Sequence, residues 1–200
     1  MRMGTLVEGL PSTVNVGGIS LPLATGHRTW LRVWELTGAD DVAPWVKALG
    51  VFKLAYGGIE PVAGHEEEAL EQALAFLDRT LGSDVPPRPL TMRERRLAKK
   101  RLFDWTHDAQ RLVADFQREY GMDLTDPGLE LHWWRFMALF NGLSDASGTM
   151  EAIAVRAADL DDKGLSKEGR KSLRERKAGV LLPARNEDEA REAQRILRGS

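Results

Sequence analysis

The residues best suited to metal chemistry are Asp104, His107 and Asp108, which are spaced three and four apart and would share one helix face. Two carboxylates and one imidazole are plausible ligands, but no fourth ligand follows nearby. The chain has no cysteine, and its four histidines do not show the H-E-x-x-H spacing of a zinc site. We therefore interpret the three residues as a solvated, charged helix face, and we expect no metal and no cofactor.

A second candidate is His132, within "ELHWWRFMALFNGL", residues 130–143. A histidine could act as a general base, but one on a helix rich in tryptophan is more often a core or interface residue. The sequence also lacks Gly-x-Ser-x-Gly, a phosphate-binding loop and a dinucleotide fingerprint. These observations make His132 a weak candidate for catalysis.

A basic stripe, residues 88–101 with the sequence RPLTMRERRLAKKR, holds seven Lys/Arg and one Glu. Such a stripe can follow a phosphate backbone, so a nucleic-acid-binding module is an open alternative. The competing interpretation is the solvated start of a helix. The net charge of −2 makes nucleic acid the less favoured partner.

Composition is that of a globular protein, with 42% hydrophobic and 29% charged residues in 200. No apolar run approaches the roughly 20 residues needed to span a membrane. The absence of cysteine fits a reducing compartment. We expect a soluble intracellular protein without a membrane partner.

The first predicted element is a β-hairpin in STVNVGGISLPL, residues 12–23, where alternating runs flank Gly17-Gly18. Pro22 cannot donate to a strand ladder, which favours an edge strand. Apolar periodicity then predicts helices over residues 27–36, 43–56 and 66–81. The chain is thus predicted to be mainly α, with a small N-terminal unit of hairpin and helices.

A long helix is predicted next, from a capping box at 91–94 to Gly121, which should end it in the left-handed conformation. Asp126 and Pro127 resemble the start of a further helix, which would carry the tryptophan-rich stretch. More helices are predicted at 147–159 and 166–179, and Asn186 could cap a last one.

The prolines of GSDVPPRPL, residues 82–90, mark the predicted boundary between domains. We predict an N-terminal unit over 1–81, a linker over 82–90, a helical domain over 91–182, and a charged C-terminal helix or tail over 183–200. The apolar stripes of the helical domain predict these core residues: Trp105, Phe116, Tyr120, Trp133 and Phe136.

Three segments, "LFDWTHDAQRLVADFQREYGMDLTD", "ELHWWRFMALFNGLSD" and "AVRAADLDDKGLSKEGRKSLRERKAGVLLP", resemble the siphophage gp-fifteen family. The matching positions are Asp104-Trp105, Asp108-Ala109, Tyr120-Gly121 with Leu124, His132 to Phe136, Gly142-Leu143, Arg156, and Arg170 to Pro183. The loop TDPGLE is longer than the family's turn, and the tail after Pro183 has no counterpart.

The resemblance implies a non-enzymatic tail assembly chaperone, encoded beside the tape-measure protein. It would keep that protein soluble before the tail tube polymerises, in the cytoplasm of the infected bacterium, and be absent from the mature virion. The tail-tube protein is a further candidate partner. We expect client contacts at His132, Trp134, Arg135 and Arg156.

Charge is distributed unevenly: residues 1–87 hold six basic and eleven acidic residues, whereas residues 88–200 hold twenty-two and nineteen. The acidic half of one copy would attract the basic half of the next, so we expect copies to associate head to tail along a client. Salt should weaken this self-association.

Overall fold

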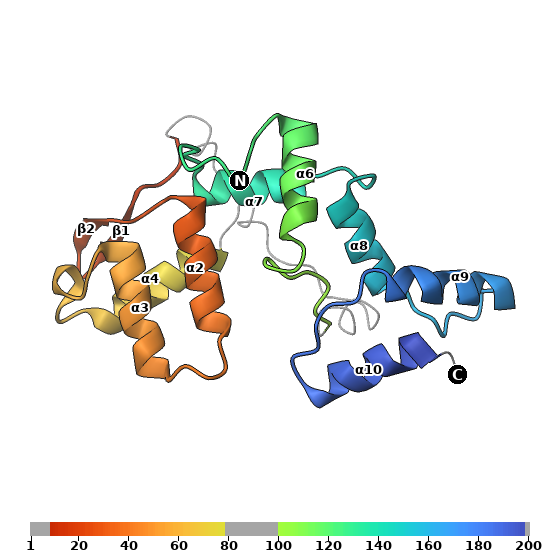
Figure 1. Ribbon diagram of the computed structural model, residues 1–200. Helices are drawn as coiled ribbons and strands as arrows, with labels where there is room; N and C mark the ends of the chain where they lie inside the picture. Colours follow the sequence, from red (N-terminus) through yellow and green to blue (C-terminus); the bar gives the residue numbers. More distant parts are fainter. Residues whose placement is uncertain (1–8, 79–99, 199–200) are drawn as a thin grey trace. The chain divides into compact units, whose positions relative to one another are not determined.

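The computed structural model describes residues 9–78 and 100–198 (Figure 1). Over these ranges the protein is mainly α-helical, with a two-stranded antiparallel hairpin near the N-terminus. This confirms the predicted fold class. None of the helices in the described ranges has the length and apolar character that crossing a bilayer requires.

The described chain divides into two compact units. The first contains residues 9–78 and 128–142, and the second contains 100–127 and 143–198. The tryptophan-rich helix therefore packs with the N-terminal residues, which differs from the predicted helical domain over 91–182. Backbone bonds explain this placement: His27 N donates to Leu131 O at 2.8 Å, and Trp133 N donates to Thr25 O at 2.7 Å. The predicted linker, 82–90, lies outside the described residues.

The predicted hairpin is present as β1 (Thr13–Val16) and β2 (Ile19–Pro22). Val16 pairs with Ile19, so the turn consists of Gly17 and Gly18, with φ of 60° and 78°. Both angles are positive, as a tight turn with this twist requires. Gly17 is also closely covered, because a Cβ there would lie 2.5 Å from His65 Nε2.

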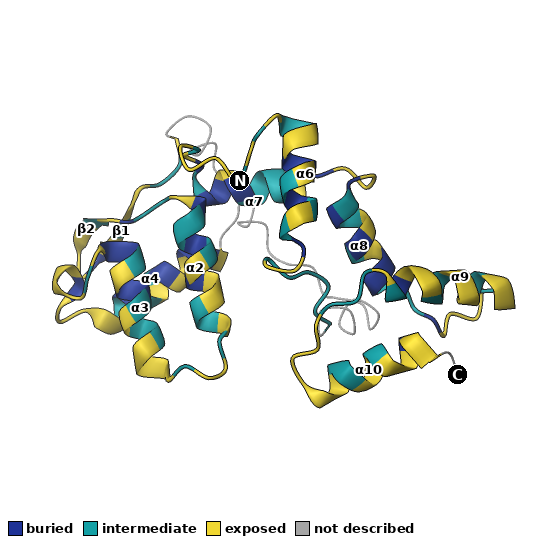
Figure 2. Ribbon diagram, in the orientation of Figure 1, coloured by how far each residue is buried: buried dark blue, intermediate teal, exposed yellow. Residues whose placement is uncertain are grey.

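The rest of the first unit is helical: α2 (His27–Gly38), α3 (Pro44–Tyr56), the short 3₁₀ helix η1 (Glu60–Val62), α4 (Glu66–Asp78) and α7 (Trp133–Asn141). Figure 2 shows buried and exposed residues alternating along α2, α3 and α4, as expected for amphipathic helices. The largest fully buried side chains in this unit are Trp30, Trp133 and Phe136.

Helix α7 begins at Trp133, later than the predicted start at Asp126-Pro127. Its N-cap is His132, whose Nδ1 accepts a hydrogen bond from Trp134 N at 3.1 Å. Residues 129–131 lie outside any helix, and Leu131 O accepts a hydrogen bond from His27 N. A long-range backbone contact therefore prevails over the local proline signal.

The second unit contains α6 (Ala109–Tyr120), α8 (Gly148–Ala157), α9 (Lys167–Ala178) and α10 (Glu187–Arg198). The last three confirm the predicted helices, and Asn186 Oδ1 accepts from Glu189 N at 2.9 Å, as a cap should. Gly121 ends α6 with φ of 65°, also as predicted.

The predicted helix over 91–120 is wrong between residues 101 and 108, where the chain is irregular and then turns. Aspartates compete there for the backbone: Asp104 Oδ1 accepts from Thr106 N and His107 N at 3.0 and 2.9 Å, and Asp108 Oδ2 accepts from Asp104 N at 3.1 Å. Such local bonds favour turns over helix. The predicted capping box at 91–94 lies outside the described residues.

Candidate functional site

The predicted charged face around Asp108 is in fact the buried centre of the second unit. Asp108 is 1% exposed, and it receives two hydrogen bonds from Arg156, Nη1 to Oδ2 at 2.7 Å and Nη2 to Oδ1 at 2.8 Å. Burial, the largest single influence, would raise the pKa of Asp108. The hydrogen bonds from Arg156 and from the Asp104 amide, with the positive charges of Arg156 and Arg111, together outweigh it and hold that pKa below its usual value. The interpretation of Asp108 as solvated was wrong.

Arg156 is fully engaged within the fold, which corrects its assignment as a client contact. Its Nε donates to Val180 O at 2.6 Å, and its Nη1 also donates to Leu102 O at 2.9 Å. These bonds join α8 to the segment before α6 and to the chain after α9. The role of Arg156 in the described structure is to hold these three segments together.

The other two members of the predicted cluster do not join Asp108 in a metal site. Asp104 forms ion pairs with Arg101 and Arg185, each at 2.8 Å, and His107 is exposed. Across the described residues, no group of three or more His, Cys, Asp or Glu side chains has an arrangement that could hold a metal ion.

The tryptophans of α7 are committed to the core of the first unit. Trp133 Nε1 donates to Leu77 O and Trp134 Nε1 donates to Phe76 O, both at 3.0 Å. Phe76 stacks against Trp134 with ring centroids 5.2 Å apart, and Trp133 stacks on Phe136 at 5.7 Å. The aromatic surface of this helix therefore packs against α4 and its own neighbours.

This packing corrects a second predicted client contact, because Trp134 is only 8% exposed. His132 is also used internally, since its Nε2 lies 2.9 Å from Pro11 O while its Nδ1 caps α7. Of the four predicted contacts, Arg135 alone is exposed.

The predicted core residues differ in how far they are buried. Phe116, Trp133 and Phe136 are completely buried, whereas Trp105 and Tyr120 are only partly buried. Trp105 precedes α6 and lies in a turn, so it does not share the helical stripe that the spacing predicted.

Residues 88–99 of the basic stripe lie outside the described residues, but its last two members are visible. Lys100 pairs with Glu192 at 3.0 Å, and Arg101 pairs with Asp104 at 2.8 Å and Glu189 at 3.0 Å. These two cations are thus neutralised by carboxylates of their own unit.

The sequence did not single out the surface that best suits binding, which lies on α3. Trp45 is 68% exposed, and Val46 and Leu49 are 37% and 44% exposed. Leu49 follows Val46 by three residues and Trp45 by four, so both side chains neighbour that of Leu49 on the helix surface. We call the three residues the α3 apolar face; Trp34, on the neighbouring helix α2, is also 47% exposed.

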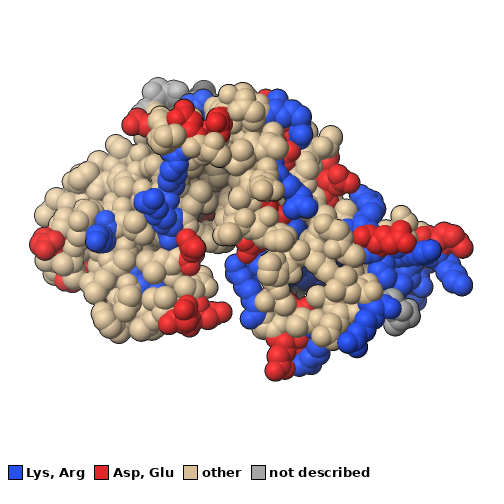
Figure 3. Space-filling model, viewed as in Figure 1, with Lys and Arg blue, Asp and Glu red and all other residues tan. Residues whose placement is uncertain are grey.

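A possible sequence signal was the wide apolar arc of α3. The second half of the helix supplies Val51, Phe52, Ala55 and Tyr56 to the core. Trp45 and Leu49 continue the stripe of Phe52 and Tyr56 into the first half of the helix, where it is exposed. Figure 3 shows few charged side chains over the visible part of the first unit's helices, whereas those of α9 and α10 are densely charged.

Comparison with known proteins matches residues 6–182 to the family described as Bacteriophage Gp15 protein. No curated protein and no solved structure gives a significant match. The matched segment covers both units and ends before α10. It includes the Asp108–Arg156 pair and the tryptophans of α7. The chain therefore belongs to the bacteriophage Gp15 protein family.

Proposed function

We propose that this phage protein is a tail assembly chaperone that binds the tape-measure protein and keeps it soluble until the tail tube polymerises. The α3 apolar face is the observation that carries the proposal, because it presents a tryptophan and two aliphatic side chains to solvent. The resemblance of the His-Trp-Trp-x-Phe segment to siphophage chaperones supports the same role.

The chemistry of such a client matches this face. A long helix with apolar stripes aggregates unless the stripes are covered. Amphipathic helices bind partners through apolar side chains spaced one helical turn apart, and a tryptophan at the centre of the contact often dominates the binding energy. Trp45 and Leu49 are one turn apart and could receive such a stripe.

The helix that carries the face is well fixed in the free protein. Pro44 stands in its first turn, Gly57 ends it with φ of 84°, and four of its residues reach the core. A preordered face loses little entropy on binding. Its small size favours weak, reversible contact, which suits a client that is later passed to the tail-tube protein.

The proposal includes a non-enzymatic role in the cytoplasm of the infected bacterium and absence from the mature virion. Copies would line up along one client, and the uneven charge of the two halves would assist that self-association.

Co-expression with the tape-measure protein of the same phage tests the proposal. The wild-type chain should raise the soluble fraction of the tape-measure protein and co-purify with it. A Trp45→Ser, Leu49→Ser variant should lose both effects. Leu197→Ser is the matched control, since Leu197 is 64% exposed but lies on α10. If all three chains raised the soluble fraction of the tape-measure protein equally, the α3 apolar face would not be the binding site. If the wild-type chain did not raise it, the proposed function would be wrong.

A further inference from the structure

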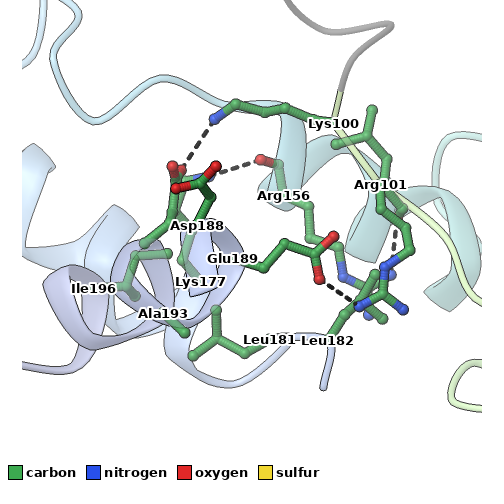
Figure 4. Close-up of a pocket in the computed structure, with 12 residues that line it drawn as sticks. Lys100, Arg101, Arg156, Lys177, Leu181, Leu182, Asp188, Glu189, Ala193 and Ile196 are labelled. Carbon is green, nitrogen blue, oxygen red and sulfur yellow. Dashed lines mark hydrogen bonds and ion pairs between the residues drawn. The ribbon is translucent and has the colours of Figure 1, made fainter. Parts of the chain in front are cut away.

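Helix α10 lies over a cleft of about 230 Å³ that it does not fill. Apolar side chains from three segments line it: Leu102 before α6, Leu181 and Leu182 after α9, and Ile196 of α10 itself (Figure 4). The helix and the surface under it are therefore loosely fitted.

Few side chains of α10 reach the fold. Ile196 is its buried residue, with 5% exposure, and Leu197 beside it is 64% exposed. The helix also follows residue 182, where the family match ends. Thus α10 attaches to the family's common structure through Ile196, the small side chain of Ala193 and a set of charged contacts.

In these charged contacts, carboxylates of α10 form ion pairs with cationic side chains that line the cleft. Glu192 pairs with Lys100 and Glu189 with Arg101, both at 3.0 Å. Figure 4 shows the carboxylate of Glu189 directed at Arg101, in the segment that precedes α6. The Lys100–Glu192 pair is partly exposed, with side chains 35% and 46% accessible, so it contributes little and is weakened by salt. The Arg101–Glu189 pair is less exposed, at 16% and 33%.

The floor of the cleft is also cationic. Lys177 is 5% exposed and donates to Arg156 O at 2.7 Å, and the buried Nε of Arg101 has no hydrogen-bond partner among residues 9–78 and 100–198. If α10 left the cleft, Lys100 would lose its ion pair with Glu192, and Arg101 would lose its ion pair with Glu189. An uncovered cleft would therefore attract an acidic, amphipathic helix.

We propose that this cleft is a docking site for an acidic amphipathic helix of a partner protein, and that α10 occupies it in the free chain as an exchangeable substitute. The recognised pattern is two carboxylates three residues apart followed by an aliphatic residue four positions later, as Glu189, Glu192 and Ile196 show. This site is separate from the α3 apolar face and does not depend on the proposed function.

Peptide binding to the full chain tests the proposal. The probe is a fluorescent peptide with the α10 sequence, followed by anisotropy. In the release variant Glu192→Lys, Ile196→Asp, α10 should leave the cleft, so the peptide should bind at least tenfold more tightly than to wild type. Arg191→Ala is the matched control, since its contacts are with Glu187 and Asp188 on the same helix. It should bind as wild type does.

Two further peptides test the chemistry of the partner. A designed helix of unrelated sequence that keeps the two carboxylates and the isoleucine should bind the release variant. The same helix with the carboxylates moved to its opposite side should not. Equal binding of both peptides, or no gain in the release variant, would overturn the proposal. If the release variant bound the peptide more tightly only because two chains had paired, the cleft would be a site for a second copy, and the proposal would also be overturned.

Hydrogen exchange on the wild-type chain keeps the test independent of whether the release variant folds. An exchangeable α10 should show amide protection at least tenfold lower than α8, and 0.5 M salt should lower it further. Protection of α10 equal to that of α8 would contradict the proposal.

Discussion

Arg156 and Asp108 form a buried, doubly hydrogen-bonded ion pair that joins α8 to the turn before α6, with bonds of 2.7 and 2.8 Å. The same guanidinium bonds the carbonyl oxygens of Leu102 and Val180. Four bonds from one side chain thus connect three segments of the second unit. A sequence motif that resembled a metal cluster is in this structure part of a scaffold.

Removing one partner of this pair should be costly. We expect Asp108→Ala to lower the free energy of unfolding of the second unit by about 3–5 kcal/mol, because Arg156 would stay buried without a counter-charge. The measurement is urea unfolding followed by circular dichroism. Arg176→Ala, which breaks an exposed ion pair with Glu151 in the same unit, should cost below about 1 kcal/mol. Similar losses in both variants would contradict the buried pair.

The indole N–H of Trp133 should stabilise the first unit and not the second. Trp133→Phe removes its bond to Leu77 O and leaves that carbonyl without its partner, at a cost of about 1–3 kcal/mol. Trp45→Phe, an exposed control on α3, should stay within about 0.5 kcal/mol of wild type. Hydrogen exchange measures amide protection separately in the helices of each unit, so it shows which unit Trp133→Phe destabilises. A loss of protection in α8 and α9 in place of α2 and α4 would show that α7 belongs to the second unit.

The two units should respond to acid in different pH windows. Burial lowers the pKa of His27 in the first unit, so its unfolded state binds a proton more readily. Stability of that unit should fall as the pH drops below about 6.5, the value for an unfolded histidine.

In the second unit the buried acids with a lowered pKa are Asp108 and Asp115. Burial alone would raise their pKa values, but hydrogen bonds from Arg156 to Asp108, and from Thr149 and Gly148 to Asp115, lower them. Stability of this unit should be retained until the pH drops below about 3.9, the unfolded value for aspartate. Denaturant unfolding at pH 7.5, 5.5 and 3 checks both windows. Loss of the second unit's stability between pH 7.5 and 5.5 would contradict this assignment.

Gly17 should tolerate substitution less well than Gly18. Both have positive φ, which costs an alanine roughly 1–2 kcal/mol, but only at Gly17 would the new Cβ meet the His65 ring, at 2.5 Å. We therefore expect Gly17→Ala to destabilise the first unit more than Gly18→Ala in thermal unfolding. Adding His65→Ala should recover part of the difference. Equal effects of the two substitutions, with no recovery, would exclude the clash.

Local signals predicted most of the elements correctly. The glycine pair fixed the hairpin, Gly121 ended α6, and Asn186 capped α10. Each of these depends on backbone geometry within a few residues, which sequence patterns describe well. The fold class followed from the helical periodicity.

The errors have long-range causes. Periodicity extended a helix through residues 101–108, but Asp108 bonds with Arg156, 48 residues away, and its neighbours form turns. The sequence pattern assigned Trp133 to the core and Trp134 to a client contact, whereas both indoles donate to carbonyl oxygens at the end of α4. The exposure of Trp45 likewise depends on which part of α3 meets the core, because Phe52 and Tyr56 on the same face are buried. None of these partners can be read from residues nearby in the chain.

Hydroxyl-radical footprinting of the chain with and without the tape-measure protein tests the central claim most directly. Trp45 is highly exposed in the free protein, so its oxidation should be rapid and should fall several-fold in the complex, together with that of Leu49. Leu197, exposed on α10, should be oxidised equally in both states. A complex that forms while Trp45 and Leu49 stay as reactive as in the free chain would contradict a chaperone that holds its client on α3.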